Sequence, residues 1–97
     1  MKKTSAKILV VDDDPEIVEI LKYNLSNSDF EVKVAYNGIQ AVKKSKKFNP
    51  DIILMDVMMP EMNGIEACTE IRNIDNLKNV QIISVSYTHL RAHETRN

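Results

Sequence analysis

The sequence contains a single cysteine, Cys68, which excludes a disulfide framework and a cysteine-ligated zinc site. No apolar run approaches the roughly 18 residues that a membrane-spanning helix needs, and the N-terminus lacks the apolar core of a secretion signal. Charge of neither sign is in excess, since 13 basic residues stand against 14 acidic ones. This balance gives no reason to expect direct binding to nucleic acid or to a membrane. We therefore expect a cytoplasmic location.

The remaining composition is typical of one globular domain. The chain has 97 residues, of which 43% are apolar and 28% charged, and these proportions exclude a disordered chain. Short apolar, β-branched runs predict four strands, at 8–11, 30–35, 51–55 and 79–83. Apolar residues at helical spacing predict three helices between them, at 15–25, 39–48 and 65–73. Strands that alternate with helices imply an α/β fold with a parallel sheet.

Several local signals refine this prediction. Asp14 and Pro15 are typical of an N-cap and the first helical residue, and Asn49 with Pro50 is expected to end the second helix. The residues predicted to face the core from the second and third helices are Ile39, Ala41, Val42, Phe48, Ile65, Cys68, Thr69 and Ile71. The lysines at 43, 44, 46 and 47 are interpreted as a solvated helix face, with a binding patch as the alternative.

Acidic residues follow two of the predicted strands. Asp12 and Asp13 end the first strand, and Asp56 ends the third. If the strand order is 2-1-3, these carboxylates converge at one edge of the sheet, where open parallel sheets bind ligands. Mg²⁺ prefers such oxygen ligands and often joins them to phosphate, and a carboxylate can itself attack phosphorus. Ordinary strand-end polarity is the alternative interpretation.

Two stretches of the sequence resemble a known family. The run from Ile8 to Asp13 and the run from Ile53 to Gly64, which reads ILMDVMMPEMNG, together resemble the receiver domain of two-component response regulators. The resemblance implies a flavodoxin-like, doubly wound parallel sheet. Relative to the family's strand order 2-1-3-4-5, we expect a truncated sheet of order 2-1-3-4, with the fourth helix, fifth strand and fifth helix missing.

The resemblance also implies roles for single residues. Asp56 matches the aspartate that accepts a phosphoryl group from a sensor histidine kinase, and it also belongs to the implied metal site. Asp13 matches a direct Mg²⁺ ligand, and Asp12 matches a ligand that acts mainly through water. The backbone carbonyl of Met58 matches one that binds the ion, and Ser86 falls at the position of a Ser or Thr that hydrogen-bonds the phosphoryl group. The family's lysine and aromatic switch residue on strand five have no counterpart in this sequence.

The last residues resemble translated adaptor sequence rather than part of a receiver domain. The run VSYTHLRAHET, residues 85–95, resembles one reading frame of the mosaic-end adaptor used in transposase-based sequencing libraries. We therefore expect residues 1–84 to form a partial receiver domain and residues 85–97 to be a non-native tail, with a genuine short tail as the alternative. The match of Ser86 is then a coincidence. Without a fifth helix and strand, part of Ile52 or Ile53 is expected to be uncovered and the fourth strand to form a bare edge, so the chain is expected to be unstable or to self-associate.

The expected function is that of a non-enzymatic phosphoacceptor module. The resemblance implies that a histidine kinase phosphorylates Asp56 in the presence of Mg²⁺, and that this switches an output domain outside this chain, with transcription regulation as the expected output. One alternative is a vestigial receiver that only binds other proteins. Another is a Mg²⁺-dependent aspartyl phosphatase, which is disfavoured because Val57 and Met58 follow Asp56 where such enzymes usually carry a second aspartate.

Overall fold

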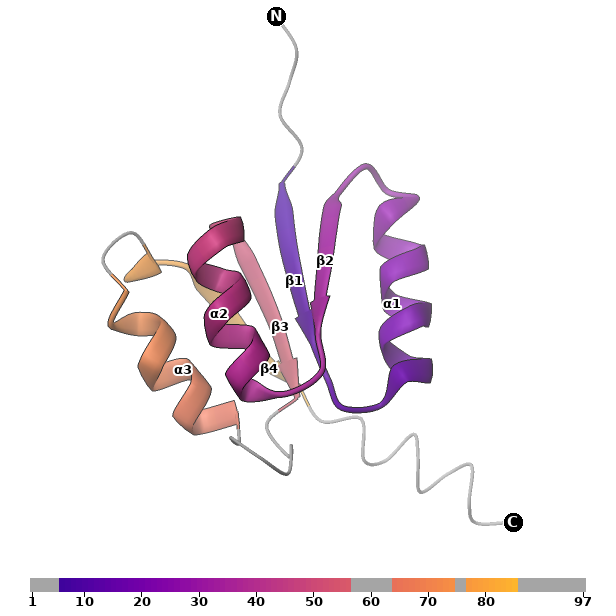
Figure 1. The fold of residues 1–97 in the computed structure, drawn as a ribbon. Coiled ribbons are helices and arrows are strands. Elements are labelled where there is room, and N and C mark those ends of the chain that lie inside the picture. Colours follow the sequence, from indigo (N-terminus) through magenta and orange to yellow (C-terminus); the bar gives the residue numbers. More distant parts are fainter. Residues whose placement is uncertain (1–5, 57–63, 75–76, 86–97) are drawn as a thin grey trace, which may run out of the picture.

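The fold is a four-stranded parallel sheet with helices on both faces. The computed structural model describes residues 6–56, 64–74 and 77–85 of the chain. The strands are β1 (Lys7–Val11), β2 (Glu31–Ala35), β3 (Ile52–Asp56) and β4 (Gln81–Val85), and their order is β2-β1-β3-β4. The helices are α1 (Pro15–Ser26), α2 (Gly38–Phe48) and α3 (Gly64–Arg72). Helix α1 covers one face of the sheet, whereas α2 and α3 lie on the other (Figure 1).

This arrangement confirms the predicted fold class and strand order. The pairs β1–β2, β1–β3 and β3–β4 are all parallel. No fifth strand is present in the ranges 6–56, 64–74 and 77–85. Within these same ranges, no helix is both long and apolar enough to cross a bilayer.

Short-range hydrogen bonds set the ends of α1 and α2. The Asp14 carboxylate accepts a hydrogen bond from the Glu16 amide at 3.0 Å, so Asp14 is the predicted N-cap. At the start of α2, the Asn37 side chain accepts from the Gln40 amide at 2.8 Å, and the Gln40 side chain accepts from the Tyr36 amide at 2.9 Å.

Helix α2 also ends where the sequence predicts. Asn49 adopts the left-handed conformation with φ of 53°, and its amide donates to the Ser45 carbonyl. Asparagine tolerates this conformation better than most residues, and the following Pro50 cannot continue a helix. The chain is thereby turned directly into β3, the strand that ends in Asp56.

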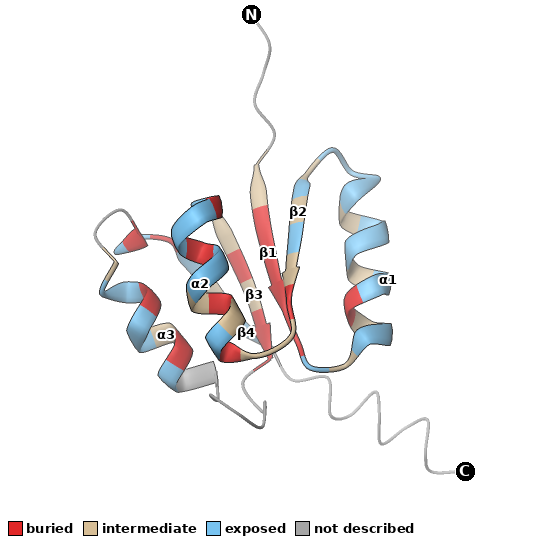
Figure 2. Ribbon diagram, viewed as in Figure 1, coloured by how far each residue is buried: buried red, intermediate tan, exposed pale blue. Residues whose placement is uncertain are grey.

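The two sheet faces bury two separate apolar clusters. The larger cluster lies under α2 and α3, and its members from the strands include Leu9, Val11, Ile53 and Met55. The smaller cluster centres on Ile8, Val10 and Val18, beneath α1. Figure 2 shows the buried residues concentrated along β1 and β3, in the middle of the sheet. Alternate residues of these two strands therefore supply both faces, as expected for strands covered on both sides.

The predicted inward face of α2 is wrong at one position. Ile39 is 46% exposed, and the buried residues of the helix are Gly38, Ala41, Ser45 and Phe48. These four positions follow one another at steps of three or four and form a single stripe, from which Ile39 is rotated by about 100°. Small side chains in this stripe let the helix pack closely on the sheet. Ala41 and Phe48 are buried and Val42 packs against the larger cluster, as predicted, so sequence hydrophobicity misjudged Ile39 alone.

Two further predictions need correction. Thr69 on α3 is exposed, while Ile71 is fully buried and Cys68 is half-buried. Strand β4 begins at Gln81 rather than at 79, because a turn in which the Val80 amide donates to the Leu77 carbonyl precedes it. It also continues through Val85, one residue beyond the predicted domain boundary at 84.

The sheet face that carries α1 is only partly covered. Helix α1 packs against β1 and β2, so the described residues place no helix over β3 and β4 on this side. Ile52 and Leu54 are half-buried there, and Ile83 is 39% exposed. Ile53 points to the opposite face and is fully buried, so of the two residues expected to be uncovered only Ile52 is.

Candidate metal and phosphoacceptor site

The carboxyl ends of β1 and β3 bring three aspartates together. Because these strands are neighbours in the sheet, Asp12, which directly follows β1, lies beside Asp56, the last residue of β3. One carboxylate oxygen from each of Asp12, Asp13 and Asp56 lies within 4.8 Å of the others. Asp12 and Asp56 are fully buried, whereas Asp13 is exposed. The cluster therefore has a closed side and an open side.

Backbone hydrogen bonds hold Asp12 in place. Its amide donates to the Ala35 carbonyl at 3.1 Å, which extends the β1–β2 ladder by one step. Its carboxylate accepts from the Asp14 amide at 2.9 Å. Asp14 in turn caps α1, so the turn from β1 into α1 positions the aspartate through both its backbone and its side chain.

Three carboxylates at this separation repel one another strongly. Two unit charges 4.8 Å apart repel by roughly 3 kcal/mol at an effective dielectric constant of about 20. A divalent cation bound among Asp12, Asp13 and Asp56 removes this cost, and three hard carboxylate oxygens are the donors that Mg²⁺ prefers. Since Mg²⁺ also retains several waters, the exposed side at Asp13 suits it. The donor set therefore fits the ion that the sequence predicts.

The structure thus brings together three of the five predicted site residues. Met58 and Ser86 both lie outside the described residues. The anchoring of Asp12 by the Ala35 carbonyl was not anticipated from the sequence, although strand pairing in register would have indicated it.

The single cysteine lies near this edge but is not suited to nucleophilic chemistry. The Cys68 sulfur on α3 is 3.9 Å from the sulfur of Met55, the residue before Asp56. Burial raises the pKa of the Cys68 thiol, and the Arg72 guanidinium opposes this shift only in part. The thiol therefore stays protonated at neutral pH, which disfavours nucleophilic attack by its sulfur.

Comparison with known proteins gives a consistent result. The family model of the response regulator receiver domain matches residues 8–96. Over 66 residues the chain is 48% identical to the alkaline phosphatase synthesis transcriptional regulatory protein PhoP of Bacillus subtilis, a match that covers 68% of this chain and 28% of that protein. The chain therefore spans little more than a quarter of the length of this curated relative.

Solved structures with the same fold include two from signalling proteins. The chemotaxis response regulator CheY4 of Vibrio cholerae is 30% identical with a TM-score of 0.80, over 94% of this chain and 79% of that one. The receiver domain of the sensor histidine kinase PA1611 of Pseudomonas aeruginosa is 32% identical with a TM-score of 0.81, over 93% of this chain and 75% of that one. The latter structure holds a magnesium ion coordinated in its active site cleft.

Proposed function

This chain belongs to the family of response regulator receiver domains, and we propose that it is a phosphoacceptor module that takes a phosphoryl group on Asp56. The observation that carries the proposal is the convergence of Asp12, Asp13 and Asp56 within 4.8 Å at the carboxyl edge of neighbouring strands. Two of these like charges, Asp12 and Asp56, are fully buried and therefore costly to maintain, and a bound cation offsets that cost.

The proposed metal site uses Asp12, Asp13 and Asp56, together with the backbone carbonyl of Met58. Mg²⁺ bound there supplies positive charge that neutralises the oxygens of a phosphoryl group in transfer. The magnesium-bound receiver domain of PA1611 supports this assignment. Following the family resemblance, Asp13 would hold the ion directly, and Asp12 would act mainly through water.

The proposed reaction is a phosphoryl transfer from a phosphohistidine of a sensor histidine kinase. A carboxylate oxygen of Asp56 attacks phosphorus and forms an acyl phosphate, while the phosphorus–nitrogen bond breaks. The electron pair of that bond returns to the imidazole, which takes up a proton. Asp56 is buried at the end of β3, so its backbone is held by the sheet during the attack. The chain in this role is a signalling module rather than an enzyme.

The consequences of phosphorylation are proposed to lie in a larger protein. Since the chain spans 28% of the transcriptional regulator PhoP, we propose a cytoplasmic regulator whose output domain controls transcription. Residues 1–84 then form part of its receiver domain, and residues 85–97 are proposed to be a non-native tail. In that case Ser86 has no role in phosphoryl transfer, although the family match extends across this segment.

Acetyl phosphate labelling tests the proposal. The chain is incubated with acetyl phosphate and Mg²⁺, and its intact mass is measured. We expect the added mass of one phosphoryl group on a minor fraction of the chain, because the family's lysine has no counterpart in this sequence, and we expect this mass to be lost in Asp56→Asn and in the presence of a chelator. Asp29→Asn is the matched control, because Asp29 is exposed in the turn after α1 and tolerates the same change. Labelling that survives in Asp56→Asn, or no labelling of the parent chain, contradicts the proposal.

A further inference from the structure

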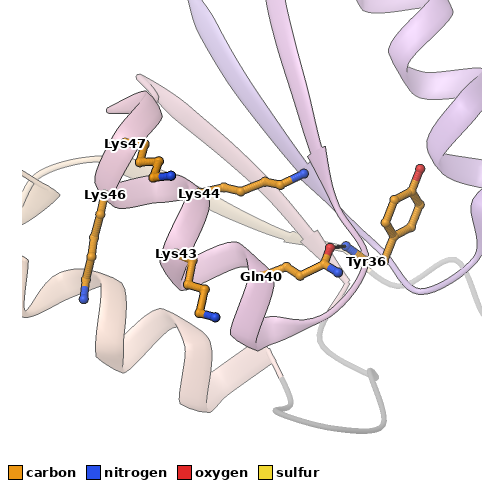
Figure 3. A pocket seen from close by; sticks show the side chains of 6 residues that line it. All are labelled: Tyr36, Gln40, Lys43, Lys44, Lys46 and Lys47. Atoms are coloured by element: carbon orange, nitrogen blue, oxygen red, sulfur yellow. Dashed lines mark hydrogen bonds between the residues drawn. The ribbon is translucent and has the colours of Figure 1, made fainter.

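The exposed side of α2 gathers positive charge beside the edge of the sheet. Four exposed lysines of this helix, at 43, 44, 46 and 47, line a hollow of about 590 Å³ with Tyr36 and Gln40 (Figure 3). A second hollow of about 380 Å³ adjoins it, lined by Lys33, Lys44, Lys47 and Phe48. We call Lys33 and the four α2 lysines the α2 lysine surface. No carboxylate lines either hollow among the residues that the structure describes.

The floor of the second hollow is aromatic. Phe48 is the last residue of α2 and is almost fully buried. The ammonium groups of Lys7 and Lys33 lie 5.6 and 5.9 Å from the centre of its ring. The hollow therefore has an apolar base and a cationic rim, and the aliphatic stems of the lysines extend the apolar surface outward.

The lysine surface borders an open strand edge. The Glu31 amide donates to the Ala6 carbonyl, and the Ala35 carbonyl accepts from the Asp12 amide, so the peptide groups of alternate β2 residues point into the sheet. The N–H and C=O groups of Val32 and Val34 consequently point outward from the edge of the sheet. The Lys44 ammonium lies 2.6 Å from the Val34 carbonyl and donates to it. A lysine of this surface thus covers one of the outward carbonyls.

We propose that the α2 lysine surface is a docking site for an acidic polypeptide segment that lies extended along α2 and the edge of β2. Carboxylates of the segment pair with the lysines, and apolar atoms between them rest on the lysine stems and Phe48. A carboxylate that draws Lys44 away from Val34 frees the carbonyl to accept a hydrogen bond from the backbone of the segment. The proposal is independent of phosphorylation at Asp56.

Size and hydrogen bonding favour a polypeptide over a nucleic acid. Positions 43 to 47 span only about 6 Å of helix axis, so few phosphates reach the surface at once. In addition, the outward amides and carbonyls of β2 can both form hydrogen bonds with a polypeptide backbone, which has donors and acceptors. A phosphodiester backbone offers acceptors only. The helix dipole accounts for Lys46 and Lys47 in the last turn, but not for Lys33 or Lys43.

Fluorescence anisotropy with the full chain tests the proposal. The probe is a fluorescein-labelled peptide of six Glu-Thr repeats, and the comparison peptide has Gln in place of Glu. The test variant is Lys43→Gln/Lys47→Gln, since the structure gives these side chains no hydrogen bond to lose within the described residues. The control variant is Lys22→Gln/Lys78→Gln, which removes the same charge from exposed positions on α1 and before β4. Circular dichroism establishes that both variants fold.

We expect the acidic peptide to bind, and the Gln peptide to bind more weakly. The test variant should weaken binding by roughly fivefold, and the control by less than about twofold. Absence of peptide binding, or equal losses in the two variants, overturns the proposal. Tighter binding of a 12-nucleotide single strand or a 12-base-pair duplex, lost in the test variant, overturns it in favour of nucleic acid. Asp56→Asn should bind the peptide as the parent does, which separates this result from that of the phosphorylation test.

Discussion

The two faces of the sheet differ in how completely they are covered, although the same strands supply both. On one face, α2 and α3 close over a continuous cluster that includes Leu9, Ile53 and Met55. On the other, α1 covers β1 and β2 but leaves Ile52 and Ile83 partly open. The closed face holds β1 and β3 together and so holds the aspartates at their ends. Stability and site geometry are therefore expected to depend mainly on one face.

Truncation of a residue on the closed face should give the largest effect. Ile53→Ala removes a fully buried side chain from the middle of β3. We expect the free energy of unfolding to fall by about 3 kcal/mol. The matched change Ile52→Ala, on the next residue and the partly open face, should cost about half as much. Urea denaturation followed by circular dichroism measures both values, and equal losses would show that the two faces contribute alike.

A substitution at the acidic edge of the sheet should raise the free energy of unfolding rather than lower it. In the absence of divalent ions, Asp12→Asn removes one of three repelling charges but keeps an oxygen that accepts from the Asp14 amide. We expect this variant to gain about 1 kcal/mol of stability without Mg²⁺ and to lose most of the parent's stabilisation by Mg²⁺. Thermal unfolding with and without Mg²⁺ distinguishes the two effects. A variant that is less stable without Mg²⁺ and still stabilised by it would argue against a metal role for Asp12.

The open face should affect association more than stability. Ile83 is 39% exposed on β4, beside Leu54 on the neighbouring strand. We expect the parent chain to self-associate through this face and Ile83→Lys to shift it toward the monomer, with a change in stability below about 1 kcal/mol. Light scattering after size exclusion measures the mass. Ile20→Lys, at an exposed position of α1, is the control. An equal change in mass for both variants would show that the chains do not associate through the open face of β4.

The smallest effect should come from the thiol on the closed face. Burial raises the pKa of Cys68, so the folded state disfavours its thiolate. Stability from this group is fully present below the pKa of the unfolded thiol and declines as pH rises above about 8.5. We expect iodoacetamide to label Cys68 more slowly in the folded chain than in urea, with a pH midpoint above that of a free thiol. Equal rates in the two states would contradict the burial of the sulfur, and Cys68→Ala controls for other sites of reaction.

Much of the architecture follows from local chemistry. The apolar runs that became β1 and β3 end at aspartates, and the pair Asp14 and Pro15 begins α1 as expected. Asn49 and Pro50 end α2 for equally local reasons. The alternation of these elements leads to a parallel sheet, and strand ends then place Asp12 and Asp56 at one edge. The ends of the helices and strands depend on neighbours in sequence, which is why local signals were sufficient to predict them. The meeting of Asp12 and Asp56 also needs β1 and β3 to be neighbours in the sheet, and that order was expected from the family resemblance.

The exposure of Ile39 and the burial of Ser45 on α2 could not be derived in this way, although Ala41, Val42 and Phe48 pack inward as predicted. Ile39 is the more apolar residue, yet Ser45 is buried and Ile39 is exposed. The close approach of α2 to the sheet favours small side chains along its inner stripe, and that approach depends on strands and helices distant in sequence. The contact between Lys44 and the Val34 carbonyl has the same origin, since only the packed fold brings the helix beside the edge of β2.

The sequence alone therefore determined the kind of the elements, their order along the chain and the parallel sheet, because these depend on local propensity and on the alternation of strands with helices. The tertiary structure decided that Ile39 and Thr69 are exposed while Ser45 is buried, that Ile52 rather than Ile53 lies on the partly open face, and how the lysines meet the edge of β2. These outcomes depend on the packing of surfaces that are far apart in the chain, and packing is settled only when all the elements are in place.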